Sequence, residues 1–84
     1  MPVTVQFDLP YDLLRSIEET PEAFAHAMRV AAAVKWYETG RVSQGKGAEL
    51  AGLSREAFHR ALGDFGVSAF QVTPDELREE LQRL

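Results

Sequence analysis

The chain has 84 residues, no cysteine and a formal net charge of −4. A chain of this length builds only a marginal core, so we expect one domain spanning residues 1–84 that is stabilised as a homodimer or by a permanent partner. The lack of cysteine excludes a disulfide scaffold and thiolate metal ligands, and without a leader or a membrane-spanning apolar run we expect a cytoplasmic protein with no membrane partner.

Residues 3–9 alternate strictly between apolar and polar side chains, which predicts a half-buried strand that Pro10 ends. The following segment, from Tyr11 to about Glu19, has apolar residues at helical spacing and is predicted to be a short helix.

A long central helix is predicted from Pro21 to about Thr39, with Thr20 as its N-cap and Gly40 as its left-handed stop. Its second half, residues 30–37, is apolar nearly all round, which is typical of a helix buried on more than one side. This helix is therefore either the centre of the chain's own core or shared across a dimer interface. Three of its side chains are expected to pack in the core or an interface rather than bind a ligand: His26, Trp36 and Tyr37.

The segment from Ser43 to about Gly63 has the spacing of a helix-turn-helix, two short helices joined by a tight turn. Ala48 is expected to be small because the second helix passes over it, and Gly52 falls where the chain reverses and a positive φ costs least. Phe58 supplies the apolar face that docks the second helix on the first. Because such a motif mainly presents a helix to the DNA major groove, DNA binding is the hypothesis to test.

A turn at residues 63–66 precedes a second predicted strand over residues 67–72, so the expected fold class is α+β, mostly α. A capping-box pattern beginning at Thr73 then predicts a last helix over residues 74–84. Its leucine stripe either folds back on the body or fits a partner's groove. The candidate partner-binding residues are Leu77, Leu81 and Leu84.

Eight residues of the helix-turn-helix are candidates for contact with double-stranded DNA. Arginine and glutamate side chains on the second helix, which a serine caps, have the hydrogen-bonding groups that read guanine and cytosine edges. At the start of the first helix, backbone N–H groups and a lysine suit phosphate contacts. The candidates are Ser43, Gln44, Lys46, Ser54, Arg55, Glu56, His59 and Arg60.

The charge distribution agrees with this placement. Residues 35–60 hold five basic and three acidic residues, a balance of +2, whereas residues 1–34 and 61–84 each have a balance of −3. A few phosphate contacts per subunit would need two copies for useful affinity. The alternative hypothesis is a protein–protein adaptor that uses the helix-turn-helix only as a packing unit.

Several segments together resemble the uncharacterised protein family 0175, a family of predicted helix-turn-helix antitoxins of prokaryotes. They are Val-Gln-Phe-Asp-Leu-Pro near the N-terminus, Ala-Val-Lys-Trp-Tyr-Glu-Thr-Gly-Arg-Val-Ser-Gln-Gly-Lys from Ala33, Ala-Glu-Leu-Ala-Gly-Leu-Ser-Arg from Ala48 and Gly-Val-Ser-Ala-Phe-Gln from Gly66. The resemblance implies a regulator that binds DNA near its own operon and pairs with a nuclease toxin of the PIN-domain class.

One departure from the family pattern is Gly47, where alanine is the usual helix-favouring residue. Beside Gly45 it lowers the helix propensity of the first helix by roughly 1 kcal/mol, which predicts a frayed or 3₁₀-like helix.

The sequence contains no residue pattern that is typical of a catalytic site. Residues 45–47, Gly-Lys-Gly, lack the preceding strand and the spacing of a P-loop, and the two histidines are isolated. We therefore expect no enzyme activity, no cofactor and no metal site. The sequence predicts a DNA-binding antitoxin or autoregulator that acts as a homodimer.

Overall fold

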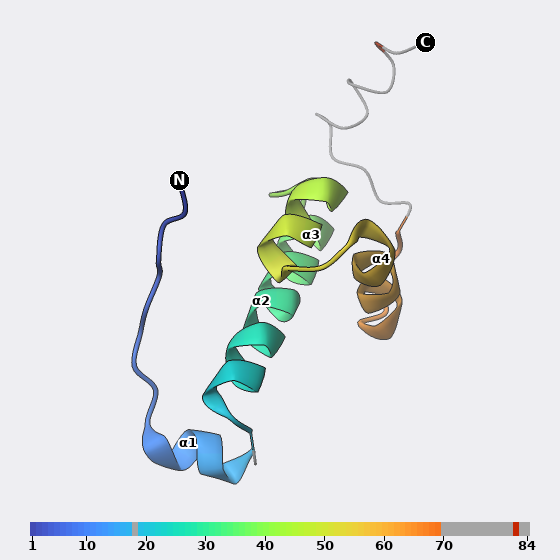
Figure 1. The fold of residues 1–84 in the computed structure, drawn as a ribbon. Helices are drawn as coiled ribbons and strands as arrows, with labels where there is room; N and C mark the ends of the chain where they lie inside the picture. The colour runs from blue at the N-terminus through green and yellow to red at the C-terminus, as the bar shows by residue number, and fades with distance from the viewer. Residues whose placement is uncertain (18, 70–81, 83–84) are drawn as a thin grey trace.

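The computed structural model describes residues 1–17, 19–69 and 82. These residues form four helices, α1 (Tyr11–Ser16), α2 (Pro21–Glu38), α3 (Gln44–Ala51) and α4 (Arg55–Asp64) (Figure 1). The C-terminal half of the long helix α2 packs with α3 and α4, whereas α1 lies at the other end of α2. Within the described ranges, no helix has the length and apolar character needed to cross a membrane.

The predicted α+β class is wrong, because the described part of the chain contains helices and no strand. Residues 3–9 run as an open segment without strand pairing (Figure 1). A β-strand forms only when a second strand lies beside it and shares its backbone hydrogen bonds. The alternation of apolar and polar residues indicates which side chains share a face, but it does not supply that second strand. Residues 67–69 are not a strand either, and residues 70–72 of that prediction lie outside the described residues.

The start of α2 is confirmed. Thr20 is the N-cap, its Oγ1 accepts a hydrogen bond from the backbone N–H of Ala23 at 3.1 Å, and Pro21 occupies the first helical position. The cap satisfies one of the amide groups that a helix start leaves unpaired, and proline has no amide hydrogen to satisfy.

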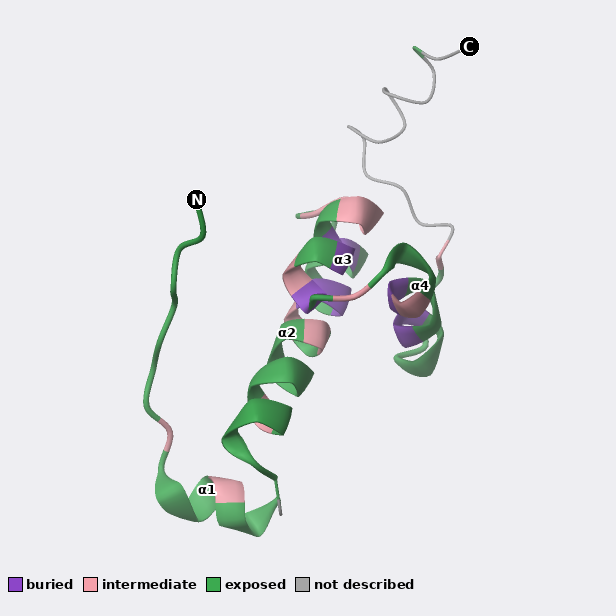
Figure 2. Cartoon of the chain, in the orientation of Figure 1, coloured by how far each residue is buried: buried purple, intermediate pink, exposed green. Residues whose placement is uncertain are grey.

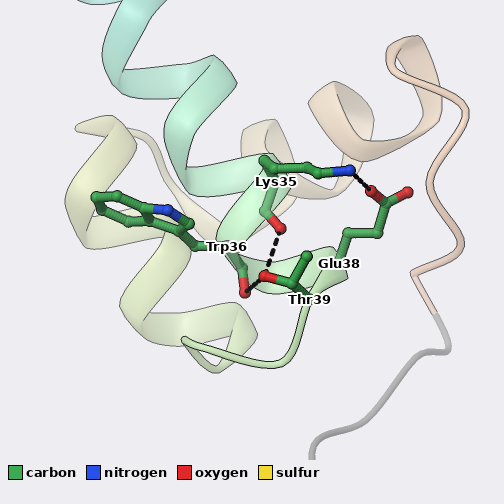
Figure 3. Close-up of polar contacts among 4 residues, drawn as sticks. All are labelled: Lys35, Trp36, Glu38 and Thr39. Atoms are coloured by element: carbon green, nitrogen blue, oxygen red, sulfur yellow. Dashed lines mark hydrogen bonds and ion pairs between the residues drawn. The ribbon is translucent and has the colours of Figure 1, made fainter.

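The end of α2 comes one residue earlier than predicted, at Glu38. The Thr39 hydroxyl donates to the carbonyl oxygens of Lys35 at 3.0 Å and Trp36 at 3.4 Å, and Lys35 forms an ion pair with Glu38 at 2.9 Å (Figure 3). Gly40 then adopts a φ of 81°, the left-handed conformation that the sequence predicts for it. These contacts close the last turn of α2 and direct the chain toward α3.

The core lies entirely in the C-terminal part of the fold, where α3 and α4 cover the second half of α2 (Figure 2). Tyr37 and Phe58 meet edge to face at its centre, with ring centroids 6.2 Å apart and planes at 83°. The Tyr37 hydroxyl also donates to the carbonyl of Ala69 at 3.2 Å. The buried hydrophobic residues are Ala33, Val34, Tyr37, Ala48, Ala51, Phe58, Ala61, Leu62 and Val67.

Two residues expected in the core or, for His26, in an interface are exposed in the single chain. His26 lies on the uncovered first half of α2. Trp36 is exposed as well, and the guanidinium carbon of Arg41 lies 4.8 Å from the centroid of its ring system. Only Tyr37 of the three takes the predicted core position, because α3 and α4 cover one side of α2 rather than its whole circumference.

Candidate nucleic-acid interface

Helices α3 and α4 are joined by a three-residue turn, residues 52–54. Gly52 ends α3 in the left-handed region, with φ 70° and ψ 32°, as its position in the sequence predicts. Ser54 then caps α4 by accepting a hydrogen bond at its Oγ from the backbone N–H of Ala57 at 3.1 Å. The order helix, glycine turn, capped helix is that of a helix-turn-helix.

The expected fraying of the first helix is wrong, since α3 is α-helical from Gln44 to Ala51. Its start is held by Ser43, whose Oγ accepts a hydrogen bond from the backbone N–H of Lys46 at 3.1 Å. Its end is held by Arg29 on α2, which the sequence analysis did not identify. The Nε of Arg29 donates to the carbonyl of Leu50 at 2.7 Å, so a cation faces the negative end of the α3 dipole.

The close approach between the two helices occurs at Gly47, one residue before the predicted position. A Cβ on Gly47 would lie 2.7 Å from Cζ and 2.8 Å from Cε2 of Phe58. Ala48 is buried too, but Gly47 is the residue that lies under the ring. Glycine at position 47 therefore has a packing reason, because only glycine leaves room for the aromatic ring.

Replacing Gly52 with alanine is expected to lower the free energy of unfolding by roughly 1–2 kcal/mol, since a residue with a Cβ is strained at this φ. The new Cβ would also lie 3.3 Å from Nη1 of Arg29. Urea denaturation followed by circular dichroism measures the change. Gly63→Ala is the matched control: it lies in α4 with open space around it, and should raise stability by roughly 0.5–1 kcal/mol. Equal effects at both glycines would contradict this account.

Five of the eight candidate DNA-binding residues line one surface hollow of about 370 Å³. Four lie on α4 as two pairs separated by one helical turn, and the fifth lies at the start of α3. Glu56, His59 and Arg60 are exposed on the side of α4 away from buried Phe58 and Leu62. Arg55 is also exposed, but it lies on the edge of α4 beside α3, where its Nη2 is 3.5 Å from Oε1 of Gln44. The lining residues are Gln44, Arg55, Glu56, His59 and Arg60.

Gln44 fixes the relative position of the elements around this hollow. Its Oε1 accepts a long hydrogen bond of 3.5 Å from Nη2 of Arg55, and its Nε2 donates to the carbonyl of Ala69 at 3.2 Å. One amide side chain thus connects α3, α4 and the segment after α4. The sequence identified Gln44 as a candidate for phosphate contact, but gave no sign of this structural role.

The other three candidates on the motif are engaged locally. The hydroxyls of Ser43 and Ser54 accept the capping hydrogen bonds of α3 and α4. Lys46 is exposed, with its Nζ 3.3 Å from Oε2 of Glu49. A surface ion pair of this kind contributes little to stability, so Lys46 is able to exchange Glu49 for another anion. The candidate partner residues Leu77, Leu81 and Leu84 lie outside the described residues.

The sequence model of the Uncharacterised protein family (UPF0175) matches residues 1–84, the whole chain. The chain belongs to the UPF0175 family. No curated protein and no solved structure matches it. The family resemblance seen in the sequence is therefore confirmed.

In this UPF0175 protein, the outer face of α4 is not covered by any of the other described residues. Glu56, His59 and Arg60 are exposed and form no hydrogen bond or ion pair with another described residue. No group of three potential metal ligands occurs in the described ranges. The polar side chains of α4 thus meet solvent around a hollow, where they are accessible to a ligand.

Proposed function

We propose that this protein binds double-stranded DNA with α4 in the major groove and regulates its own operon as the DNA-binding part of an antitoxin. The observation that carries this proposal is the hollow at which Arg55, Glu56, His59 and Arg60 of α4 meet Gln44 of α3. Glu56, His59 and Arg60 are exposed and form no hydrogen bond or ion pair with another described residue.

The chemistry of this face suits base reading. An arginine donates two hydrogen bonds to O6 and N7 of guanine, and a glutamate accepts one from N4 of cytosine. Arg55 and Glu56 occupy the first turn of α4, the end of a recognition helix that contacts base edges. Arg60 and His59 lie one turn further along, within reach of either a base or a phosphate.

Phosphate contacts would come from the adjoining end of α3. Lys46 is exposed there, and the first amide groups of a helix point toward bound anions. The net charge of residues 35–60 is only +2, so one chain makes few phosphate contacts. Affinity then depends on two copies binding neighbouring half-sites, which is how helix-turn-helix dimers bind.

The antitoxin role rests on family resemblance, which pairs such regulators with nuclease toxins of the PIN-domain class. In this proposal, DNA binding and toxin binding use different parts of the chain. The α4 face binds DNA, and the toxin binds the leucine-containing sequence of residues 77–84, which was predicted as the partner-binding segment.

Fluorescence anisotropy with the duplex from upstream of the gene tests this function. We expect log Kd to rise with log salt concentration, with a slope of about 2–3 per protomer between about 50 and 200 mM salt. A scrambled duplex of equal composition should bind more weakly. A folded protein that binds neither duplex at the lowest salt would overturn the proposal and favour the adaptor hypothesis.

A further inference from the structure

The N-terminal part of the fold has apolar side chains but no core. Among the described residues before Ala33, none is buried (Figure 2). Val3, Val5 and Phe7 of the extended segment are 86%, 80% and 59% exposed. Isolated exposed apolar residues are common, but a contiguous group marks an interaction surface. The exposed large hydrophobic residues between positions 3 and 28 are Val3, Val5, Phe7, Tyr11, Leu13, Ile17 and Met28.

A hollow of about 510 Å³ lies between this extended segment and the first half of α2. Val5 and Phe7 line one side, and Phe24 and Met28 of α2 line the other. The exposed apolar residues of the segment and of α2 therefore form one surface. We name this surface the N-terminal face.

We propose that a second copy of this chain covers the N-terminal face, with the two extended segments 3–9 lying antiparallel across a twofold axis at Gln6. Residues 3–9 form no strand within the single chain, and the new backbone hydrogen bonds run between chains. This inference does not depend on DNA binding.

The available area fits a dimer. Each exposed apolar residue offers on the order of 100 Å² at most, so that the four on the extended segment and α2, together with Tyr11, Leu13 and Ile17 of the adjoining α1, provide up to about 700 Å² per chain. That is close to the roughly 800 Å² that each partner buries in an interface of standard size.

The apolar pattern restricts the register of the two segments. Residues directly opposite each other in an antiparallel pair lie on the same face, so apolar residues must oppose apolar residues. A centre at Gln6 places Val3 opposite the partner's Leu9 and Val5 opposite the partner's Phe7. It also places Asp8 opposite the partner's Thr4, which avoids a like-charge contact. The pattern thus has the self-complementarity that a twofold interface requires.

The positions of the two prolines favour this register over the registers centred one residue earlier or later. Pro2 and Pro10 lie at equal distances from Gln6, so they face each other beyond the ends of the pairing, and residues 3–9 pair without interruption. A centre at Val5 or Phe7 also opposes apolar residues, but brings a proline opposite Asp8 or Thr4. Because proline has no amide hydrogen to donate, either shift shortens the uninterrupted pairing from seven residues per chain to five.

The oligomeric state of substituted chains tests the interface. Light scattering after gel filtration should give a dimer for the unchanged chain at about 50 μM. Phe7→Asp should raise the dimer Kd at least about 100-fold, because a symmetric dimer would bury one new aspartate from each chain. Thr4→Lys is the control on the other face of the segment and should keep the dimer. Since Phe7 is exposed in the single chain, circular dichroism should show unchanged helices. A monomeric unchanged chain, or a dimer unaffected by Phe7→Asp, would overturn the proposal.

Cross-linking tests the register. The chain has no cysteine, so an introduced thiol is unique. In Gln6→Cys the two thiols lie directly opposite each other, within the Cα separation that a disulfide allows. In Thr4→Cys they are four residues apart, about 13 Å, so oxidation should be at least about tenfold slower. When Thr4→Cys chains are mixed with Asp8→Cys chains, disulfides should form between one chain of each kind, because positions 4 and 8 lie opposite each other. Equal rates for Gln6→Cys and Thr4→Cys would overturn the register.

Discussion

Replacing Arg55 and Arg60 together with alanine is expected to weaken binding to the upstream duplex at least about 30-fold. Each arginine in a bidentate contact with guanine contributes roughly 1–3 kcal/mol, and both side chains line the hollow between α4 and the start of α3. The fold should tolerate the change because both residues are exposed and the one hydrogen bond lost, from Arg55 to Gln44, is 3.5 Å long. Fluorescence anisotropy measures the affinity, and thermal denaturation followed by circular dichroism checks the fold.

Two further variants show what the arginines do. Arg15→Ala removes one positive charge from α1, away from α4, and should change the affinity less than about twofold. Lysine at both positions 55 and 60 keeps the charge but not the planar pair of donors. That variant should keep most of the salt dependence while losing preference for the upstream duplex over a scrambled one. An alanine double variant that binds as tightly as the unchanged chain would exclude α4 as the reading helix.

Features that depend on neighbours in the sequence were predicted well. Thr20 with Pro21 marks the start of α2, and Gly40 and Gly52 occupy positive φ after helices. The outward face of α4 follows from its 3.6-residue period, which separates Phe58 from Glu56, His59 and Arg60. In each case the interacting residues lie within about one helical turn of each other, so the local sequence is enough to predict the feature.

Features that depend on distant partners were not predicted. Residues 3–9 have the pattern of a strand, but no neighbouring segment of the described chain pairs with them. Trp36 lies in an apolar stretch, yet α3 and α4 leave its side of α2 uncovered. Arg29 and Gln44 hold elements together through backbone carbonyls, and any residue supplies such a carbonyl. Sequence patterns of side chains therefore contain no sign of these contacts.

Gly47→Ala is expected to lower the free energy of unfolding by about 1–3 kcal/mol, although helix propensity alone predicts a gain of about 1 kcal/mol. The added methyl group would lie 2.7 Å from Cζ of Phe58. This ring is fully buried and packs edge to face on Tyr37, so it has little room to move. Urea denaturation followed by circular dichroism gives the sign and the size of the change.

Gly45→Ala is the matched control in the same helix. Its new Cβ would meet only Nη1 of Arg55, at an ordinary contact distance of 3.8 Å, so the propensity gain of up to about 1 kcal/mol should appear. In a Phe58→Leu background the ring is absent, and Gly47→Ala should become neutral or stabilising. A double-mutant cycle between positions 47 and 58 should therefore give a coupling of at least about 1 kcal/mol. If Gly47→Ala stabilises the unchanged chain as Gly45→Ala does, the ring does not require glycine beneath it, and alanine would fit equally well.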